Sequence, residues 1–103
     1  MIRKVKIGPL EVSVDLVKDL ERTTGALGEN DVAHQIIRID ADTRPEERLY
    51  MLLAEVMEIA DWVYLQGYLQ EEVSGGHNMI HILAGVLAQV LQDNGLIFID
   101  LED

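Results

Sequence analysis

The sequence predicts an α+β domain in which a small, mostly antiparallel sheet packs on two long helices. Two stretches near the N-terminus alternate apolar and polar residues with period two, which is typical of strands. Two longer stretches in the second half repeat apolar residues every three or four positions, which is typical of amphipathic helices. Because 103 residues supply one hydrophobic core, we expect a single domain over residues 1–103.

The first strands are predicted to form a β-hairpin. Residues 5–7 and 11–16 have the alternating pattern, and Gly8-Pro9 between them is typical of a tight turn. Residues 17–24 are compatible with either a connection or a single helical turn.

Further strands are predicted in the chain before the first long helix and after the second. Residues 25–28 are predicted to form a short strand, followed by a turn at residues 29–31. Residues 34–40 are a stronger strand candidate, because their β-branched side chains favour a pleated, half-buried surface. Residues 96–100 are the candidate for a last strand.

The first long helix has clear boundary signals. Thr43 and Glu46 match a capping box with Thr43 as the N-cap, and Pro45 falls in the first turn, where its missing N–H costs no hydrogen bond. Gly67 is expected to end this helix. Apolar residues at helical spacing predict one stripe that faces the core: Leu49, Leu52, Leu53, Val56, Ile59, Ala60 and Val63.

A second long helix is predicted over residues 78–93, with Asn94-Gly95 as its C-terminal stop. Its larger apolar residues are expected to face inward: Ile80, Leu83, Leu87, Val90 and Leu91. Ala84, Gly85 and Ala88 form a strip of small residues, which would let another helix approach closely, either within this chain or from a second copy.

The charge and composition exclude several classes of function. A formal net charge of −11 argues against direct binding to nucleic acid, which relies on clustered Lys and Arg. The acidic surface would suit a partner protein with a basic surface, or it simply keeps a small protein soluble. The absence of cysteine excludes disulfides, thiolate metal ligands and thiol catalysis.

The same sequence gives no signal for a membrane or for export. No apolar run approaches the roughly 20 residues of a membrane span. The N-terminus runs directly into a strand pattern where a signal peptide would have its apolar core. We therefore expect no membrane contact and a cytoplasmic location.

The most informative stretch is residues 52–60, Leu-Leu-Ala-Glu-Val-Met-Glu-Ile-Ala. It aligns with the His-Glu-x-x-His motif, in which two histidines one helical turn apart hold zinc and the glutamate polarises a zinc-bound water. Ala54 and Glu58 stand at the two histidine positions, and Glu55 stands at the glutamate position.

The surrounding elements follow the order of a known family. Four features follow one another in the same order as in this family: a strand like residues 36–40, an arginine-containing helix start like residues 44–48, the motif helix, and a second helix that ends like residues 83–94. Over residues 25–94 the chain resembles the small zincin-like proteins, related to metallopeptidases of the ImmA/IrrE type, that bacteriophages and mobile elements encode. The resemblance implies that the domain is a zincin-like remnant.

Carried over position by position, the resemblance implies that the catalytic site is lost. Ala54 has no donor atom, and the third ligand of the family would fall at His77 or Asn78. Glu55 matches the general base, but a base without a metal-polarised water is vestigial. The resemblance therefore implies a pseudoenzyme with no catalytic residues, no bound metal and no cofactor.

An alternative is that a different metal site has replaced the zinc site. Glu55 and Glu58 are three residues apart on the first helix, and His77 and His81 are four apart at the second, so each pair shares a helical face. If the two faces meet, these side chains could hold zinc, manganese or iron. Otherwise the glutamates belong to a solvated face, and the histidines are polar residues at the helix start or partners of those carboxylates.

Three aromatic residues near the end of the first helix are candidates for partner binding: Trp62, Tyr64 and Tyr68. Aromatic side chains often anchor protein interfaces. The alternative is that Trp62 is a large residue at the edge of the core.

Together these features predict a catalytically inactive binding protein of bacteriophage origin, which engages or inhibits a host protein through its acidic surface. Two alternatives remain open. One is a metal-dependent hydrolase with rearranged ligands, and the other is a self-associating accessory protein, for example a homodimer.

Overall fold

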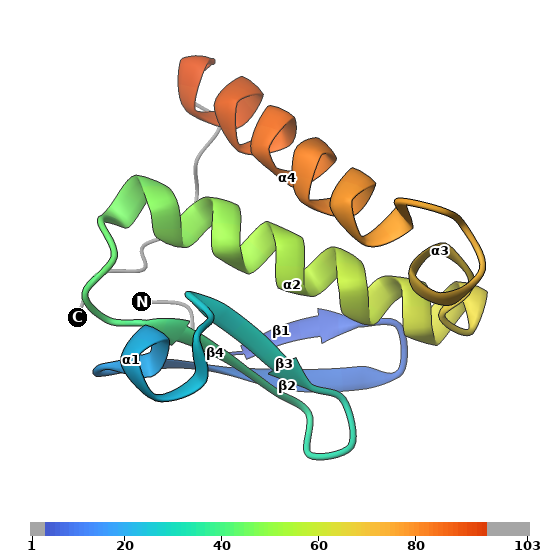
Figure 1. The fold of residues 1–103 in the computed structure, drawn as a ribbon, viewed down its shortest axis with the longest axis horizontal. Coiled ribbons are helices and arrows are strands. Elements are labelled where there is room, and N and C mark those ends of the chain that lie inside the picture. The colour runs from blue at the N-terminus through green and yellow to red at the C-terminus, as the bar shows by residue number, and fades with distance from the viewer. Residues whose placement is uncertain (1–3, 95–103) are drawn as a thin grey trace.

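Four strands and four helices make up residues 4–94, the part of the chain that the computed structural model describes (Figure 1). The predicted strand at residues 96–100 lies outside the described residues. In chain order the elements are β1 (Lys4–Ile7), β2 (Leu10–Val17), α1 (Leu20–Thr24), β3 (Gly28–Asp31), β4 (Ile36–Asp40), α2 (Pro45–Leu65), α3 (Tyr68–Glu71) and α4 (Gly76–Asp93).

The α+β class is confirmed, and the sheet is mixed. Its strand order is β1-β2-β4-β3. The β1/β2 and β3/β4 pairs are antiparallel, whereas β2 and β4 run parallel. The parallel pair arises because the chain leaves β2, passes through α1 and β3, and returns beside β2 as β4. Two antiparallel hairpins are thus joined along one parallel seam.

The prediction of a strand at residues 25–28 and a turn at residues 29–31 was wrong, because the strand lies at Gly28–Asp31. Gly25 adopts a left-handed conformation with φ 81° and caps α1, donating its N–H to the carbonyl of Glu21 at 2.7 Å. A helix C-cap cannot also begin a strand, so β3 starts at Gly28 and includes the residues expected to form a turn. The turn comes later, at residues 32–35, and β4 therefore begins at Ile36.

The hydrophobic core lies between the sheet and α2. Side chains from β1, β2 and β4 meet those of α2 in one cluster, whose buried members are Ile7, Val12, Val14, Ile37, Ile39, Leu52 and Ile59. α4 packs on α2, on the side away from the sheet (Figure 1). The prediction that both long helices pack on the sheet is therefore correct only for α2, and the domain has three layers.

The start of α2 differs from the predicted capping box. The N-cap is Arg44, with extended backbone and no side-chain cap, and Pro45 is the first helical residue. The Thr43 hydroxyl instead donates to the carbonyl of Asp40 at 2.7 Å. The buried Arg48 guanidinium donates to the carbonyls of Thr43 and Ala41 at 3.1 and 2.7 Å, which holds the loop before the helix.

A buried carboxylate fixes the corner where α2 ends. α2 stops at Leu65, two residues before the predicted Gly67, because Gln66 takes a left-handed conformation with φ 56°. Asp61 accepts hydrogen bonds from the backbone N–H groups of Leu69 and Gln70 at 3.0 and 3.2 Å. These bonds satisfy amides in the first turn of α3, and they turn the chain back toward α2.

α4 presents a different face to α2 from the one predicted. Its buried positions are mainly small: Gly76, Ile80, Ala84 and Ala88. Leu83, Leu87 and Val90, which were expected to face inward, are exposed. The strip of small residues faces α2 within the same chain, and a Cβ at Gly85 would lie 3.7 Å from the Tyr50 ring.

Gly76 is the residue that sets where α4 begins. A Cβ on Gly76 would overlap the carbonyl oxygen of Leu69, a backbone atom that cannot move without shifting α3. We predict that Gly76→Ala destabilises the domain by about 1–3 kcal/mol, as overpacking typically does. Chemical denaturation of the variant and the wild type measures the difference.

Gly85→Ala is the matched control. Its added methyl would make only an ordinary contact with Tyr50, and alanine is favoured over glycine inside a helix by up to about 1 kcal/mol. Gly85→Ala should therefore leave stability unchanged or raise it. Equal losses of stability in both variants would mean that the close approach at Gly76 is not the cause.

Candidate functional site

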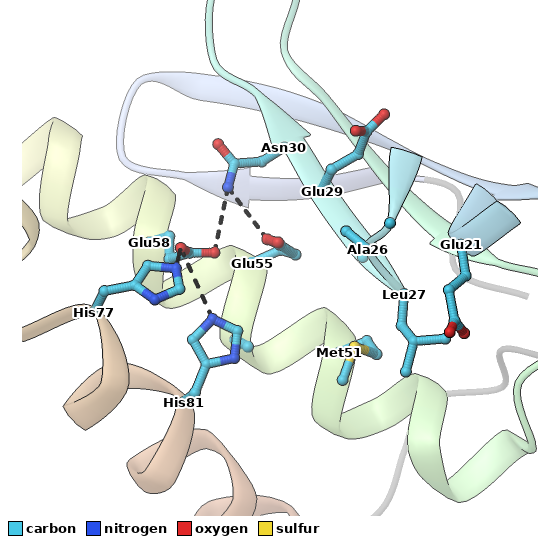
Figure 2. A pocket seen from close by; sticks show the side chains of 13 residues that line it. Glu21, Ala26, Leu27, Glu29, Asn30, Met51, Glu55, Glu58, His77 and His81 are labelled. Atoms are coloured by element: carbon cyan, nitrogen blue, oxygen red, sulfur yellow. Dashed lines mark hydrogen bonds and ion pairs between the residues drawn. The ribbon is translucent and has the colours of Figure 1, made fainter. Parts of the chain in front are cut away.

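A pocket of about 580 Å³ lies where β3, α2 and α4 come together. Figure 2 shows five polar side chains gathered at one end of the pocket, with Met51, Ala26, Leu27 and Glu21 toward the other; the five are Asn30, Glu55, Glu58, His77 and His81. None of the lining residues is Lys or Arg, and four are glutamates. They are Glu21, Gly25, Ala26, Leu27, Gly28, Glu29, Asn30, Met51, Ala54, Glu55, Glu58, His77 and His81.

α2 places two glutamates at the polar end of the pocket. Glu55 and Glu58 are each only 5% exposed, so the interpretation that they belong to a solvated face is wrong. They are three residues apart and therefore share the side of α2 that turns toward β3 and α4. A buried carboxylate is costly unless it has partners, so the surrounding groups determine what this pair can do.

Asn30 on β3 supplies one of these partners. Its amide nitrogen Nδ2 donates to Oε2 of Glu55 at 3.2 Å and lies 3.5 Å from Oε2 of Glu58. Asn30 was not among the predicted site residues, because residues 29–31 were expected to form a turn. Only the pairing of β3 with β4 brings this side chain over α2, and no local sequence signal indicates that pairing.

α4 supplies the other partners. Nε2 of His77 lies 2.7 Å from Oε1 of Glu58, and Nε2 of His81 lies 3.8 Å from the same oxygen (Figure 2). The two imidazole rings lie one helical turn apart and contact each other at a tilt of 38°, with centroids separated by 4.6 Å. The two helix faces therefore meet, which is the condition that the sequence analysis set for a metal site.

Tyr50 holds His81 from the opposite side. Its hydroxyl shares a hydrogen bond with Nδ1 of His81 at 3.1 Å, and the two rings contact edge to face. This bond leaves Nε2 of His81 turned toward Glu58. Nε2 is buried and has no hydrogen-bond partner within residues 4–94.

Burial changes the acid–base behaviour of this cluster. It raises the pKa of Glu55 to about 8, and the neighbouring Glu58 acts in the same direction by hydrogen bonding and repulsion. Burial also lowers the pKa of His81, and the nearby His77 lowers it further. At neutral pH, Glu55 is therefore mainly a neutral acid, which avoids placing two buried negative charges side by side.

The other motif positions have different surroundings. Ala54 is buried and contributes only its methyl group to the pocket wall. Asn78, the alternative to His77 as the third ligand position, is exposed and does not line the pocket. Of the two, His77 alone reaches Glu58.

The aromatic candidates Trp62, Tyr64 and Tyr68 are all exposed. Trp62 is 39% exposed, Tyr64 65% and Tyr68 55%. The Trp62 ring lies over Gly67, whereas the Tyr64 hydroxyl lies over Gly8 in the β1–β2 turn. Trp62 and Tyr64 therefore each lie against a glycine of this chain, with part of each side chain exposed.

The comparisons with known proteins give no match: no family model, curated protein or solved structure is similar to this chain. Within residues 4–94, no helix combines the length and apolar character that a membrane crossing requires.

The raised pKa of Glu55 predicts how stability changes with pH. In the unfolded chain Glu55 titrates near 4.5, and in the folded chain near 8. The folded state therefore binds the proton more tightly, and this contribution to stability is complete below about pH 4.5 and lost as pH rises to 8. We predict that the wild type loses stability relative to Glu55→Gln over this range, measured by denaturation in the presence of a chelator.

Glu72→Gln is the control for this comparison, because Glu72 is exposed on the surface. The stability difference between Glu72→Gln and the wild type should stay flat over the same pH range. A flat difference for Glu55→Gln as well would show that Glu55 titrates normally in the folded protein.

Proposed function

We propose that this domain is a binding protein that docks on another protein through the outer face of α4. The observation behind the proposal is a row of large apolar side chains on the side of α4 away from α2. Their exposures run from 41% for Leu87 to 58% for Ile82. This α4 outer face consists of Met79, Ile82, Leu83, Val86, Leu87 and Val90.

The spacing of these residues supports a docking surface. Positions 79, 82, 83, 86, 87 and 90 follow the three- and four-residue repeat of one continuous helical stripe. Single exposed apolar residues are normal, but a contiguous apolar stripe on a monomer typically marks an interface. Since α4 contacts α2 through its small residues, it is apolar on both sides, and such helices are usually covered on both sides.

The charges near α4 suggest which partner would fit. α4 contains no Lys or Arg and one acidic residue, Asp93 near its end. Exposed Glu71 and Glu72 lie just before its start, and the whole chain has a net charge of −11. A partner with an apolar groove and a basic rim would complement this arrangement, because apolar burial would supply affinity and opposite charge would speed the encounter.

The finer prediction, an inactive zincin-like protein of bacteriophage origin that inhibits a host protein in the cytoplasm, is supported by the sequence resemblance and the acidic charge. We propose the α4 outer face, and not the aromatic candidates Trp62, Tyr64 and Tyr68, as the main contact surface, because its six large apolar side chains form one continuous stripe. A second copy of this chain is the competing occupant, and it corresponds to the accessory-protein alternative.

Site-specific photocrosslinking tests the proposal. A photoreactive residue in place of Val86 should form a covalent adduct with the partner in producing cells, since Val86 lies at the middle of the stripe. The same residue in place of the exposed Thr23 on α1, far from α4, should not form that adduct (Figure 1). Adducts of equal yield from both positions would contradict the proposal.

A double variant tests whether the apolar stripe makes the contact, and the composition of the adduct identifies the occupant. Adding Ile82→Ser and Leu87→Ser to the Val86 protein should abolish the adduct while leaving the denaturation midpoint nearly unchanged, because exposed substitutions rarely alter stability by more than about 0.5 kcal/mol. An adduct that consists of two copies of the chain, also formed by the purified protein, would instead establish self-association.

Salt dependence tests the role of the acidic charge. With the captured partner, we predict that the association rate falls as salt rises through physiological strength, because screening weakens electrostatic steering. Ile82→Ser should mainly raise the dissociation rate. An association rate that does not change with salt would show that the acidic surface does not steer the encounter. The apolar contact alone would then account for binding.

A further inference from the structure

We propose that Glu58, His77 and His81 form a binding site for a divalent transition-metal ion, with zinc as the expected occupant. Each residue offers one ligand atom, and these atoms all lie within 4.8 Å of one another. The α4 outer face uses other residues of α4, so this proposal is independent of the docking proposal.

The two donor distances measured from Glu58 fall on either side of the spacing in a tetrahedral zinc site. Zinc bonds to nitrogen and oxygen of about 2.0–2.1 Å place neighbouring ligand atoms roughly 3.4 Å apart. The distances from Oε1 of Glu58 are 2.7 Å to His77 and 3.8 Å to His81. Admitting an ion requires His77 to move away slightly, and its side chain is 63% exposed and free to do so.

The types of donor atom favour zinc among the common metals. Two imidazole nitrogens and one carboxylate oxygen are typical of zinc and related first-row ions. Magnesium and calcium prefer a shell made of oxygen atoms. The pocket adds no competing cation, since none of its lining residues is Lys or Arg.

Two ligands are already oriented by neighbouring groups. Asn30 lies 3.5 Å from Oε2 of Glu58, which leaves Oε1 directed at the histidines. Tyr50 holds Nδ1 of His81 and so directs Nε2 toward Glu58. Groups that orient metal ligands in this way commonly improve metal affinity by 10- to 100-fold.

His81 gives an independent reason to expect a ligand. Its Nε2 is buried without a hydrogen-bond partner in the described part of the chain, and it is too far from Glu58 for a hydrogen bond. Nearly all buried polar atoms in proteins are satisfied, so such an atom requires an explanation. Coordination to a metal ion would satisfy the lone pair of this nitrogen.

The site would keep one coordination position facing the pocket. Three protein ligands and one open position are the arrangement of catalytic zinc sites, whereas structural sites have four protein ligands. The metal-dependent hydrolase alternative requires this open position. The other pocket glutamates, Glu21, Glu29 and Glu58, also disfavour an anionic occupant and favour a cation.

Titration of chelator-treated protein with zinc tests the proposal. We expect one ion per chain by calorimetry, a rise in melting temperature from mass action, and visible absorption typical of tetrahedral cobalt when Co²⁺ replaces zinc. His77→Ala and Glu58→Gln should each weaken binding more than tenfold. His77→Ala is the safer variant for folding, because His77 is largely exposed.

His34→Ala is the matched control. His34 is the third histidine of the chain, lies exposed beside Asp31, and is not part of the pocket. Its loss should leave the affinity unchanged, and Tyr50→Phe should weaken binding without removing it. Substoichiometric binding by the folded wild type, or equal binding by the wild type and His77→Ala, would overturn the proposal.

Discussion

The close contact between α2 and α4 is the constraint on which the rest of this structure depends. Ala84 and Ala88 keep α4 close to α2 along its length, and Gly76 lets α4 begin directly against the backbone of Leu69 in α3. With small residues inside, the large apolar side chains of α4 must face outward. The same orientation turns His77 and His81 toward Glu58, so one packing choice generates both the exposed stripe and the polar cluster.

That polar cluster is expensive for a domain of this size. Two carboxyl groups are buried side by side, and Glu55 avoids a second buried negative charge only by staying mainly neutral at neutral pH. Apolar residues at positions 55 and 58 would pack between α2 and β3 without this cost. Natural proteins usually keep costly buried polar groups where function requires them. The burial of Glu55 and Glu58 beside His77 and His81 therefore supports a functional role for these residues.

The sequence predicted an element well where local signals determine its position. It predicted poorly where tertiary contacts determine which residues are buried. The hairpin, β4 and the two long helices follow from turn residues and periodicity. The face of α4 could not be predicted by choosing its largest apolar residues, because the contact with α2 selects small ones. Glu58, His77 and His81 were identified as a possible group, whereas Asn30 and Tyr50 depend on strand register and helix packing, which local patterns do not contain.

The two proposed sites would be linked through α4. An ion bound by Glu58 on α2 and by His77 and His81 on α4 would bridge the two helices near the start of α4. The bridge would stabilise the packing of α4 on α2. In this packed position the outer face of α4 is presented to a partner. A partner that binds α4 in its position against α2 would in turn raise the affinity for the ion, because the free energy of coupling between two sites is reciprocal. Metal binding and protein binding are therefore compatible roles of one helix, with its two sides serving different ligands.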